Sequence, residues 1–350
     1  MSFLLLLLLC AYLLFLMCCV YAWKTGKTED PAIKPEIALS VVICARNEED
    51  TIGDLLKTLI NQSYKAEEII VVDDGSSDRT SEIVGSFSEI KLLKTNGVGK
   101  KQALKAGIAA ATQDNIVCTD ADCQVPATWL QAVASYFEKY NPSLLIMPVK
   151  MSFNSSVWQK LQALEFLSLA AVTAGSALMN RPMMCNGANL AFKKEVWLKA
   201  FDDICLDEPS GDDMFFLISC KKRKENIMFV KSPKAMVVIQ PNASLTQFCN
   251  QRSRWYSKSK SYRDIGIIAL GIITLCAVFA PVVLLLLGNW QAALLYWSIK
   301  TVADICFLSH FVSFFNAQKL MSLSVALAIV YPFYVGHIAL SGAFRKVRWK

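Results

Sequence analysis

EEIIVVDDGSSDRTSEIV, residues 67–84, is the stretch that decides the fold, because an apolar run of strand length leads through an acidic turn into a helix-like segment. The same order recurs in residues 38–61 and 90–111, and residues 114–122 (DNIVCTDAD) contain a fourth strand. Strands rich in Val and Ile that alternate with helices predict an α/β fold with a mostly parallel sheet buried on both faces.

Polar clusters follow three of these strands. Arg46 to Glu48 come after the first, Asp73 to Asp78 after the second, and Asp120 to Asp122 after the fourth. Ligands of parallel sheets bind beyond the carboxyl ends of the strands. The sequence therefore predicts a ligand site built from these clusters.

The ends of the chain are apolar. Residues 3–23 carry no charge, and about 20 helical residues cross the hydrocarbon core of a bilayer. A cleaved signal peptide is the alternative, because Val20 and Ala22 fit a cleavage site. We favour an anchor, since no basic residue precedes the run and Lys24 and Lys27 follow it.

Residues 265–344 form a second apolar zone, with candidate spans at 265–287, 292–312 and 320–340. We therefore expect an N-terminal anchor (1–23), a cytoplasmic globular domain (24–262), a membrane region of two or three spans (263–344) and a basic tail (345–350). Three spans would place the tail outside, against the positive-inside rule, so the stretch with Tyr331 and Pro332 is a candidate re-entrant segment.

Charge and cysteine usage narrow the class of protein. The net charge is +7, and basic residues cluster beside the apolar segments, which favours lipid headgroups and phosphates over nucleic acid. The twelve cysteines form no CxxC pair, and two histidines are too few for a typical zinc site. We expect a reducing compartment and no nucleic-acid partner.

Asp120 and Asp122 are two carboxylates at the end of a buried strand. They would repel each other unless a cation lies between them, and Mg²⁺ or Mn²⁺ is the hard divalent ion that carboxylates prefer. A solvated acidic loop is the plainer alternative. The position after a strand favours the metal site.

Three further segments carry candidate chemistry. Lys100 follows Gly97 and Gly99 at an expected helix start, where an anion can bind, although neither GxGxxG nor GxxxxGK is complete. Asp212 and Asp213 open another apolar helix, either as a general base or as ordinary N-terminal helix acids. QRSRW, residues 251–255, precedes the C-terminal spans and would otherwise be an interfacial helix.

Taken in order, RNE, DDGSSD, GKKQAL, DAD, GDD and QRSRW resemble the inverting family 2 glycosyltransferases with a GT-A fold, the group of cellulose, chitin and hyaluronan synthases. The resemblance covers about residues 41–255. One departure is Asp212, where the synthases usually carry Glu.

The resemblance implies a role for each motif residue. Asp213 would be the catalytic base, and Asp122 with Asp120 would hold the metal. The donor would be bound by Arg46, Glu48, Asp74, Lys100, Asp120 and Arg254, and the acceptor side would contain Asn186, Asp212, Gln251 and Trp255.

The expected function is transfer of a sugar from a nucleotide-diphosphate donor, a UDP-sugar rather than a GDP-sugar, to a membrane lipid or a growing saccharide. A processive synthase that exports its product is the alternative within the family. A catalytically silent membrane scaffold is disfavoured by the intact acids, and an oxidoreductase by the missing glycine fingerprint. The expected location is a bacterial inner membrane, with the catalytic domain in the cytoplasm.

Overall fold

The computed structural model describes residues 3–26, 35–204, 208 and 211–344. The chain forms two compact units, and each is described by itself. Among the described residues, the sheet unit comprises 35–150, 185–204, 208 and 211–240, and the helical unit comprises 3–26, 151–184 and 241–344. The predicted globular segment 24–262 is therefore divided between both units. The predicted basic tail (345–350) lies outside the described residues.

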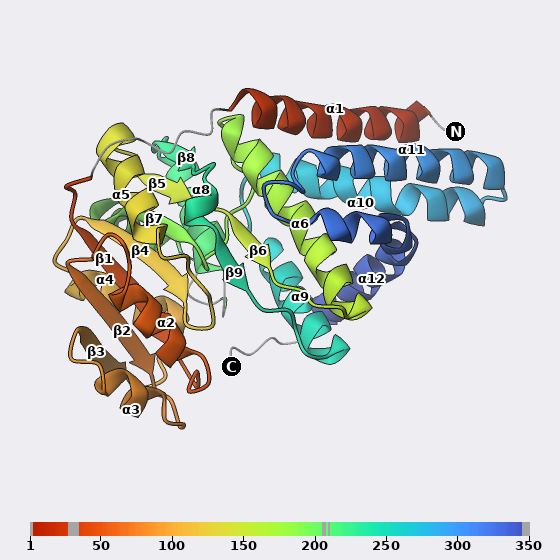
Figure 1. Cartoon of the computed structure of the whole chain (residues 1–350). Helices are drawn as coiled ribbons and strands as arrows, with labels where there is room; N and C mark the ends of the chain where they lie inside the picture. The colour runs from red at the N-terminus through yellow and green to blue at the C-terminus, as the bar shows by residue number, and fades with distance from the viewer. Residues whose placement is uncertain (1–2, 27–34, 205–207, 209–210, 345–350) are drawn as a thin grey trace. The chain divides into compact units, whose positions relative to one another are not determined.

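The sheet unit is built on seven strands in the order β3-β2-β1-β4-β7-β5-β8 (Figure 1). The strands are β1 (Leu39–Ala45), β2 (Glu68–Asp74), β3 (Ile90–Thr95), β4 (Asn115–Asp120), β5 (Leu144–Ile146), β7 (Leu190–Lys193) and β8 (Ile227–Phe229). Strands β1 to β4 pair in parallel, and β7 runs antiparallel to both neighbours. The predicted GT-A-type α/β fold with a mostly parallel sheet is confirmed. A separate two-stranded sheet joins β6 (Val149–Met151) to β9 (Val237–Ile239).

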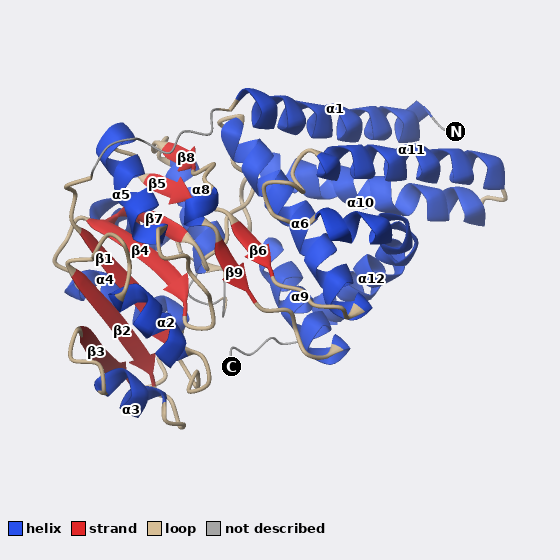
Figure 2. Cartoon of the chain, in the orientation of Figure 1, coloured by secondary structure: helices blue, strands red, loops and turns tan. Residues whose placement is uncertain are grey.

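Helices connect these strands, as Figure 2 shows by colour. They are α2 (Ile52–Ile60), α3 (Thr80–Gly85), α4 (Lys100–Ala110), α5 (Trp129–Tyr140), α7 (Lys194–Ala200) and α8 (Asp212–Lys222), with short 3₁₀ turns at Phe201–Asp203 and Pro233–Ala235. In α4, Gly107 faces β1 and β2 so closely that an added Cβ would lie 2.6 Å from Val42 and 2.8 Å from Val72. Burial on both faces explains why β1, β2 and β4 are nearly continuous apolar runs.

The helical unit contains α1 (Phe3–Thr25), α6 (Val157–Leu178), α9 (Leu245–Ser259), α10 (Ile265–Leu286), α11 (Trp290–Ser309) and α12 (Ser324–Phe344), with a 3₁₀ turn at Gln318–Leu323. Among the described residues, five helical segments are long and apolar enough to cross a membrane, which indicates an integral membrane protein. Four of them match the predicted anchor and C-terminal spans. The fifth is α6, which the sequence analysis did not single out.

Polar groups occur among these apolar helices. Lys300 donates to Asp304 at 2.6 Å, and Tyr12 donates to the other oxygen of the same carboxylate at 2.7 Å. A salt bridge with a further donor satisfies a charge that would otherwise be costly in an apolar setting. Helix α12, with Pro332 inside it, is continuous rather than broken.

Candidate active site

The carboxyl ends of β2, β1 and β4 lie side by side at one edge of the sheet. Ala45 pairs with Asp73 across β1 and β2, and Cys44 pairs with Asp120 across β1 and β4. The clusters that the sequence placed after these strands are therefore neighbours. Asp120 ends β4, and Ala121 and Asp122 form a turn rather than the extended segment expected from the alternate spacing.

Asp74 is a fully buried carboxylate that organises the loop before α4. One of its oxygens accepts from Thr95 Oγ1 at 2.6 Å and from Val98 N at 2.8 Å, and the other accepts from Gly99 N at 2.9 Å. The Asp74 side chain is 0% exposed, and Arg46 Nη1 lies 3.9 Å away. In this conformation Asp74 holds the loop that leads to Lys100.

Glu48 lies at the start of the connection from β1 to α2. Its backbone N–H donates to Thr80 Oγ1 at 2.8 Å, and its carboxylate accepts from Thr51 Oγ1 at 3.4 Å. These bonds fix the turn that carries Arg46, whose side chain is 29% exposed. Arg46 and Glu48, two of the residues predicted to bind the donor, are both partly exposed.

Lys100 is the first residue of α4 and forms an ion pair with Asp120 at 2.6 Å. Burial lowers the pKa of Lys100, but the carboxylates of Asp120 and Asp212 outweigh it and hold the pKa well above its usual range. The lysine therefore stays cationic at neutral pH. It places a fixed positive charge among the acidic groups of the site.

Asp120, Asp122 and Cys123 each offer one potential ligand atom, and these atoms lie within 4.8 Å of one another. Two carboxylates are suitable ligands for a hard divalent ion, and the thiol is tolerated better by Mn²⁺ than by Mg²⁺. Lys100 occupies one oxygen of Asp120. The residues present fit a divalent cation, and Asp122 is the exposed member of the group.

Asp212 and Asp213 form the first turn of α8, after Gly211 in a left-handed conformation (φ 94°). Asp213 Oδ2 accepts from the backbone N–H of Gly187 at 3.1 Å. Gly187 lies so close that an added Cβ would be 3.6 Å from Asp213 Cβ. The acid pair therefore adjoins the segment 186–189, in which Asn186 Oδ1 accepts from Ala188 N at 3.0 Å.

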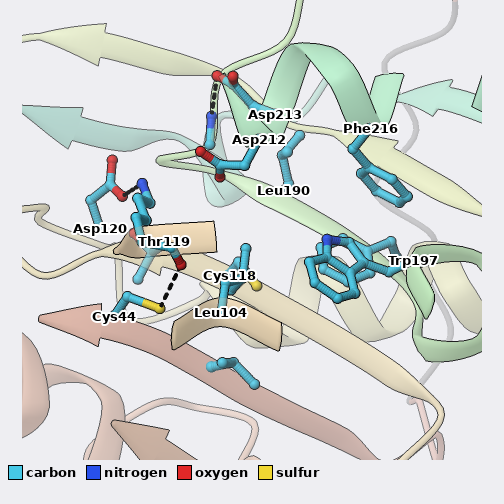
Figure 3. A pocket seen from close by; sticks show the side chains of 14 residues that line it. Cys44, Leu104, Cys118, Thr119, Asp120, Leu190, Trp197, Asp212, Asp213 and Phe216 are labelled. Atoms are coloured by element: carbon cyan, nitrogen blue, oxygen red, sulfur yellow. Dashed lines mark hydrogen bonds and ion pairs between the residues drawn. The ribbon is translucent and has the colours of Figure 1, made fainter. Parts of the chain in front are cut away.

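A single pocket of the sheet unit brings several of these groups together (Figure 3). Its polar lining includes Lys100, Asp120, Asp212 and Asp213, and its apolar lining includes Cys44, Leu104, Cys118, Leu190, Trp197 and Phe216. Burial raises the pKa of the Cys44 and Cys118 thiols, so both remain protonated parts of the pocket lining. The pocket thus combines the ammonium group of Lys100 and three carboxylates with an apolar lining.

Gln251, Arg254 and Trp255 belong to α9, which is part of the helical unit. The other predicted site residues all belong to the sheet unit. Gln251 Oε1 accepts from Asn242 Nδ2 at 3.0 Å and from Arg252 Nη1 at 2.7 Å. The motif therefore makes ordered contacts within its own unit.

Some residues of the site were not predicted. Cys123 follows the DAD motif directly, and this adjacency was the available signal. Thr119 donates to Ala188 O at 2.9 Å and ties the end of β4 to the segment beside Asp213. Trp197 lines the pocket from α7. The positions of Thr119 and Trp197 depend on tertiary packing, and no local pattern marks these two residues.

Comparison with known proteins agrees with this geometry. The sequence pattern described as Glycosyl transferase family 2 matches residues 40–197, from β1 to α7. This segment carries the sequence pattern of glycosyl transferase family 2, which covers a little under half of the chain. The matched range contains the clusters after β1, β2 and β4 and ends before Asp212.

The family members that it resembles include membrane polysaccharide synthases. It is 26% identical to the poly-beta-1,6-N-acetyl-D-glucosamine synthase of Staphylococcus aureus strain MSSA476 over 240 residues, which are 67% of this chain and 57% of that protein. It is 29% identical to the synthase of the same name from Staphylococcus epidermidis over 224 residues, 62% of this chain and 53% of that one. The match thus spans little more than half of these relatives.

A solved structure shows the fold of the family. A mannosyltransferase from Pyrobaculum calidifontis, in complex with GDP-Man and Mn²⁺, superimposes with a TM-score of 0.60 at 16% identity. The match covers 97% of this chain and 98% of that one. The likeness shows a GT-A fold, and this chain also has long apolar helices toward both ends.

Proposed function

We propose that this family 2 glycosyltransferase moves a sugar from a nucleotide-diphosphate donor to a hydroxyl or phosphate of a membrane lipid or a growing saccharide, with inversion. The observation that carries the proposal is the pocket in which Lys100 and the carboxylates of Asp120, Asp212 and Asp213 meet. An anionic leaving group needs a cation, and an attacking hydroxyl needs a base. The pocket contains both.

Asp213 is the proposed base. Its carboxylate takes the proton of the acceptor hydroxyl, and the hydroxyl oxygen attacks the anomeric carbon on the face opposite the diphosphate. The hydrogen bond from Gly187 N at 3.1 Å fixes the orientation of the carboxylate. Asp212, which is nearly buried, lies beside it on the acceptor side. A positioned base contributes roughly 10²–10⁴-fold to such a rate.

Lys100 and the metal group serve the donor in this proposal. Lys100 neutralises charge on the departing diphosphate, and Arg46 with Glu48 lies toward the nucleotide. Asp122 and Asp120 would hold Mg²⁺ or Mn²⁺, which when bound would supply positive charge to the diphosphate. Arg254 near the diphosphate, and Gln251 and Trp255 on the acceptor side, rest on the family resemblance.

The donor is proposed to be a UDP-sugar rather than a GDP-sugar. The synthases that share 26 to 29% identity with this chain are named for N-acetyl-D-glucosamine polymers. The mannosyltransferase with GDP-Man is similar at 16% identity, so it supports the fold and leaves donor choice aside. Asp74 is proposed to contact the nucleobase of the donor. This contact requires that the backbone N–H groups of Val98 and Gly99 first release the carboxylate oxygens of Asp74.

The apolar helices support an acceptor that lives in the membrane, such as a polyprenyl phosphate, a glycolipid or a diacylglycerol. The cysteines that the structure describes are all free, which fits a domain in a reducing compartment. We propose that the sheet unit lies in the cytoplasm, at a bacterial inner membrane.

A processive synthase is the second candidate. It is favoured by the synthase names of the relatives and by QRSRW in α9. The two candidates differ in product length. A single transfer gives one sugar on a lipid, and a processive enzyme gives a ladder.

The test uses the purified full chain in native lipid with a panel of UDP- and GDP-sugars and with Mn²⁺ or Mg²⁺. Mass spectrometry identifies what becomes glycosylated. One added sugar on a lipid supports single transfer, and a ladder supports the synthase. Absence of turnover with every donor would overturn the proposed activity.

A further inference from the structure

Glu165 and Arg252 form a buried ion pair that holds α9 against α6. Arg252 Nη2 donates to Glu165 Oε2 at 2.5 Å, and Arg252 Nε donates to Glu165 Oε1 at 3.2 Å. The two side chains are 4% and 6% exposed. Tyr334 of α12 donates to the same carboxylate at 3.4 Å. This fork geometry uses both carboxylate oxygens, so the pair has a fixed orientation.

The same guanidinium contacts two residues of the QRSRW segment. Its Nη1 donates to Gln251 Oε1 at 2.7 Å, and its Cζ lies 4.1 Å from the centre of the Trp255 ring. Phe248 lies on the guanidinium as well, at 4.7 Å. Residues 248, 252 and 255 share one helical face, whereas Arg254 is two residues from Arg252 and points elsewhere on the helix. The two arginines of the segment therefore have different surroundings.

Gln162, one turn before Glu165 on α6, reaches Gln251 by a second route. Its Nε2 donates to Asn242 O at 3.0 Å, and its Oε1 accepts from Asn242 N at 3.0 Å. Asn242 Nδ2 then donates to Gln251 Oε1 at 3.0 Å. With two donors on its oxygen, the Gln251 amide is left to act through its N–H groups.

We propose that Glu165 and Gln162 of α6, acting through Arg252 and Asn242, are positioning residues that set the Trp255 ring and turn the Gln251 amide so that it donates to an oxygen of the acceptor. This proposal rests on the proposed function, which assigns Gln251 and Trp255 to the acceptor side. Helix α6 of the helical unit then influences acceptor recognition through residues that do not themselves contact the acceptor. Arg252 is the arginine of the segment that links it to α6 through Glu165.

The test compares Glu165→Gln and Arg252→Lys with the native chain in lipid. Glu165→Gln keeps the shape of the side chain and removes its charge, and Arg252→Lys keeps the charge and removes the fork and the planar stack. We expect the acceptor KM to rise about tenfold, as for loss of a hydrogen bond to a charged group. We expect the nucleotide Kd to stay unchanged.

Asp304→Asn is the matched control, because it removes the carboxylate of an ion pair elsewhere in the helical unit, between Lys300 and Asp304. It is expected to lower Tm and leave the acceptor KM unchanged. If Glu165→Gln and Arg252→Lys behave as Asp304→Asn does, the proposal is wrong.

A second readout does not depend on turnover. The fluorescence difference between the native chain and Trp255→Phe isolates the Trp255 ring. The proposal predicts that Glu165→Gln shifts this difference spectrum and that Asp304→Asn does not; an unshifted spectrum overturns it. Absence of turnover by the native chain would contradict the proposed function, and the spectrum would still decide whether α6 positions Trp255.

Discussion

Asp74 shows how a single buried carboxylate can prepare a site that it does not line. It accepts hydrogen bonds from Thr95, Val98 and Gly99, and so determines where α4 begins. Lys100 is the next residue and carries the charge that meets Asp120. The position of the Lys100 ammonium group in the pocket thus depends on Asp74, the last residue of β2.

We predict that Asp74→Ala lowers the free energy of unfolding by about 3 kcal/mol, because it leaves buried donors without an acceptor. Chemical denaturation measures the change, and calorimetry should show weaker nucleotide binding. Asp50→Ala removes an exposed carboxylate and serves as the control. An Asp74→Ala protein as stable as the Asp50→Ala protein would show that the loop is held by other contacts.

Helix α4, which begins with Lys100 of the pocket, is held in position by its contact with β1 and β2. Gly107 lets the helix approach Val42 and Val72, while Gly85 of α3 has nothing within 4 Å of an added Cβ. These two glycines form a natural matched pair. The same substitution meets a packed sheet at one position and open space at the other.

Gly107→Ala is therefore expected to destabilise the fold by about 1–3 kcal/mol through overpacking. Gly85→Ala should be neutral or stabilising by up to about 1 kcal/mol, because it restricts the unfolded chain. Thermal unfolding of both variants measures the contrast. Equal Tm values would mean that α4 moves away from the sheet at little cost.

The elements also show what the sequence could predict. Strands β1, β2 and β4 were predicted because burial on both faces makes them continuous apolar runs, and their parallel order brought Arg46, Asp74 and Asp120 to one edge. The short strands β5, β7 and β8 were missed, since three or four residues show no period. Helix α6 was missed because Gln162 and Glu165 interrupt its apolar pattern, and their hydrogen-bond partners lie about 80 residues away in sequence.

The candidate site was predicted in the same uneven way. The acids and Lys100 were found because they follow strands or open helices, which are local signals. The buried state of Asp74 and the contact of Gly187 with Asp213 are tertiary properties that no local pattern reports. The roles of Gln251, Arg254 and Trp255 still rest on the resemblance.

At the scale of the whole molecule, α6 meets the length and composition of a span, yet its connections argue against a crossing. The sheet unit ends at Lys150 before it and resumes at Cys185 after it. Residues 179–184 would have to return across the hydrocarbon core, and fully extended they reach at most about 20 Å of the ~30 Å required. We predict that α6 does not cross the membrane.

Labelling with a membrane-impermeant maleimide tests this prediction, in a background with the native cysteines replaced by serine. Arg181→Cys, just after α6, and Asp114→Cys, in the sheet unit, both replace exposed residues. Both should be labelled from the same side of sealed vesicles. Labelling from opposite sides would show that α6 spans the membrane.

We propose that Asp213 acts as the base of a metal-dependent sugar transfer. The most direct measurement compares the transfer rate and the Mn²⁺-dependent nucleotide affinity of Asp213→Asn, Asp122→Asn and the control Asp114→Asn. We predict that Asp213→Asn loses roughly 10²–10⁴-fold in transfer rate while nucleotide binding stays intact. Asp122→Asn should lose the metal-dependent nucleotide binding. Asp114→Asn should resemble the native chain. A near-native transfer rate of Asp213→Asn would contradict the assignment of Asp213 as the base.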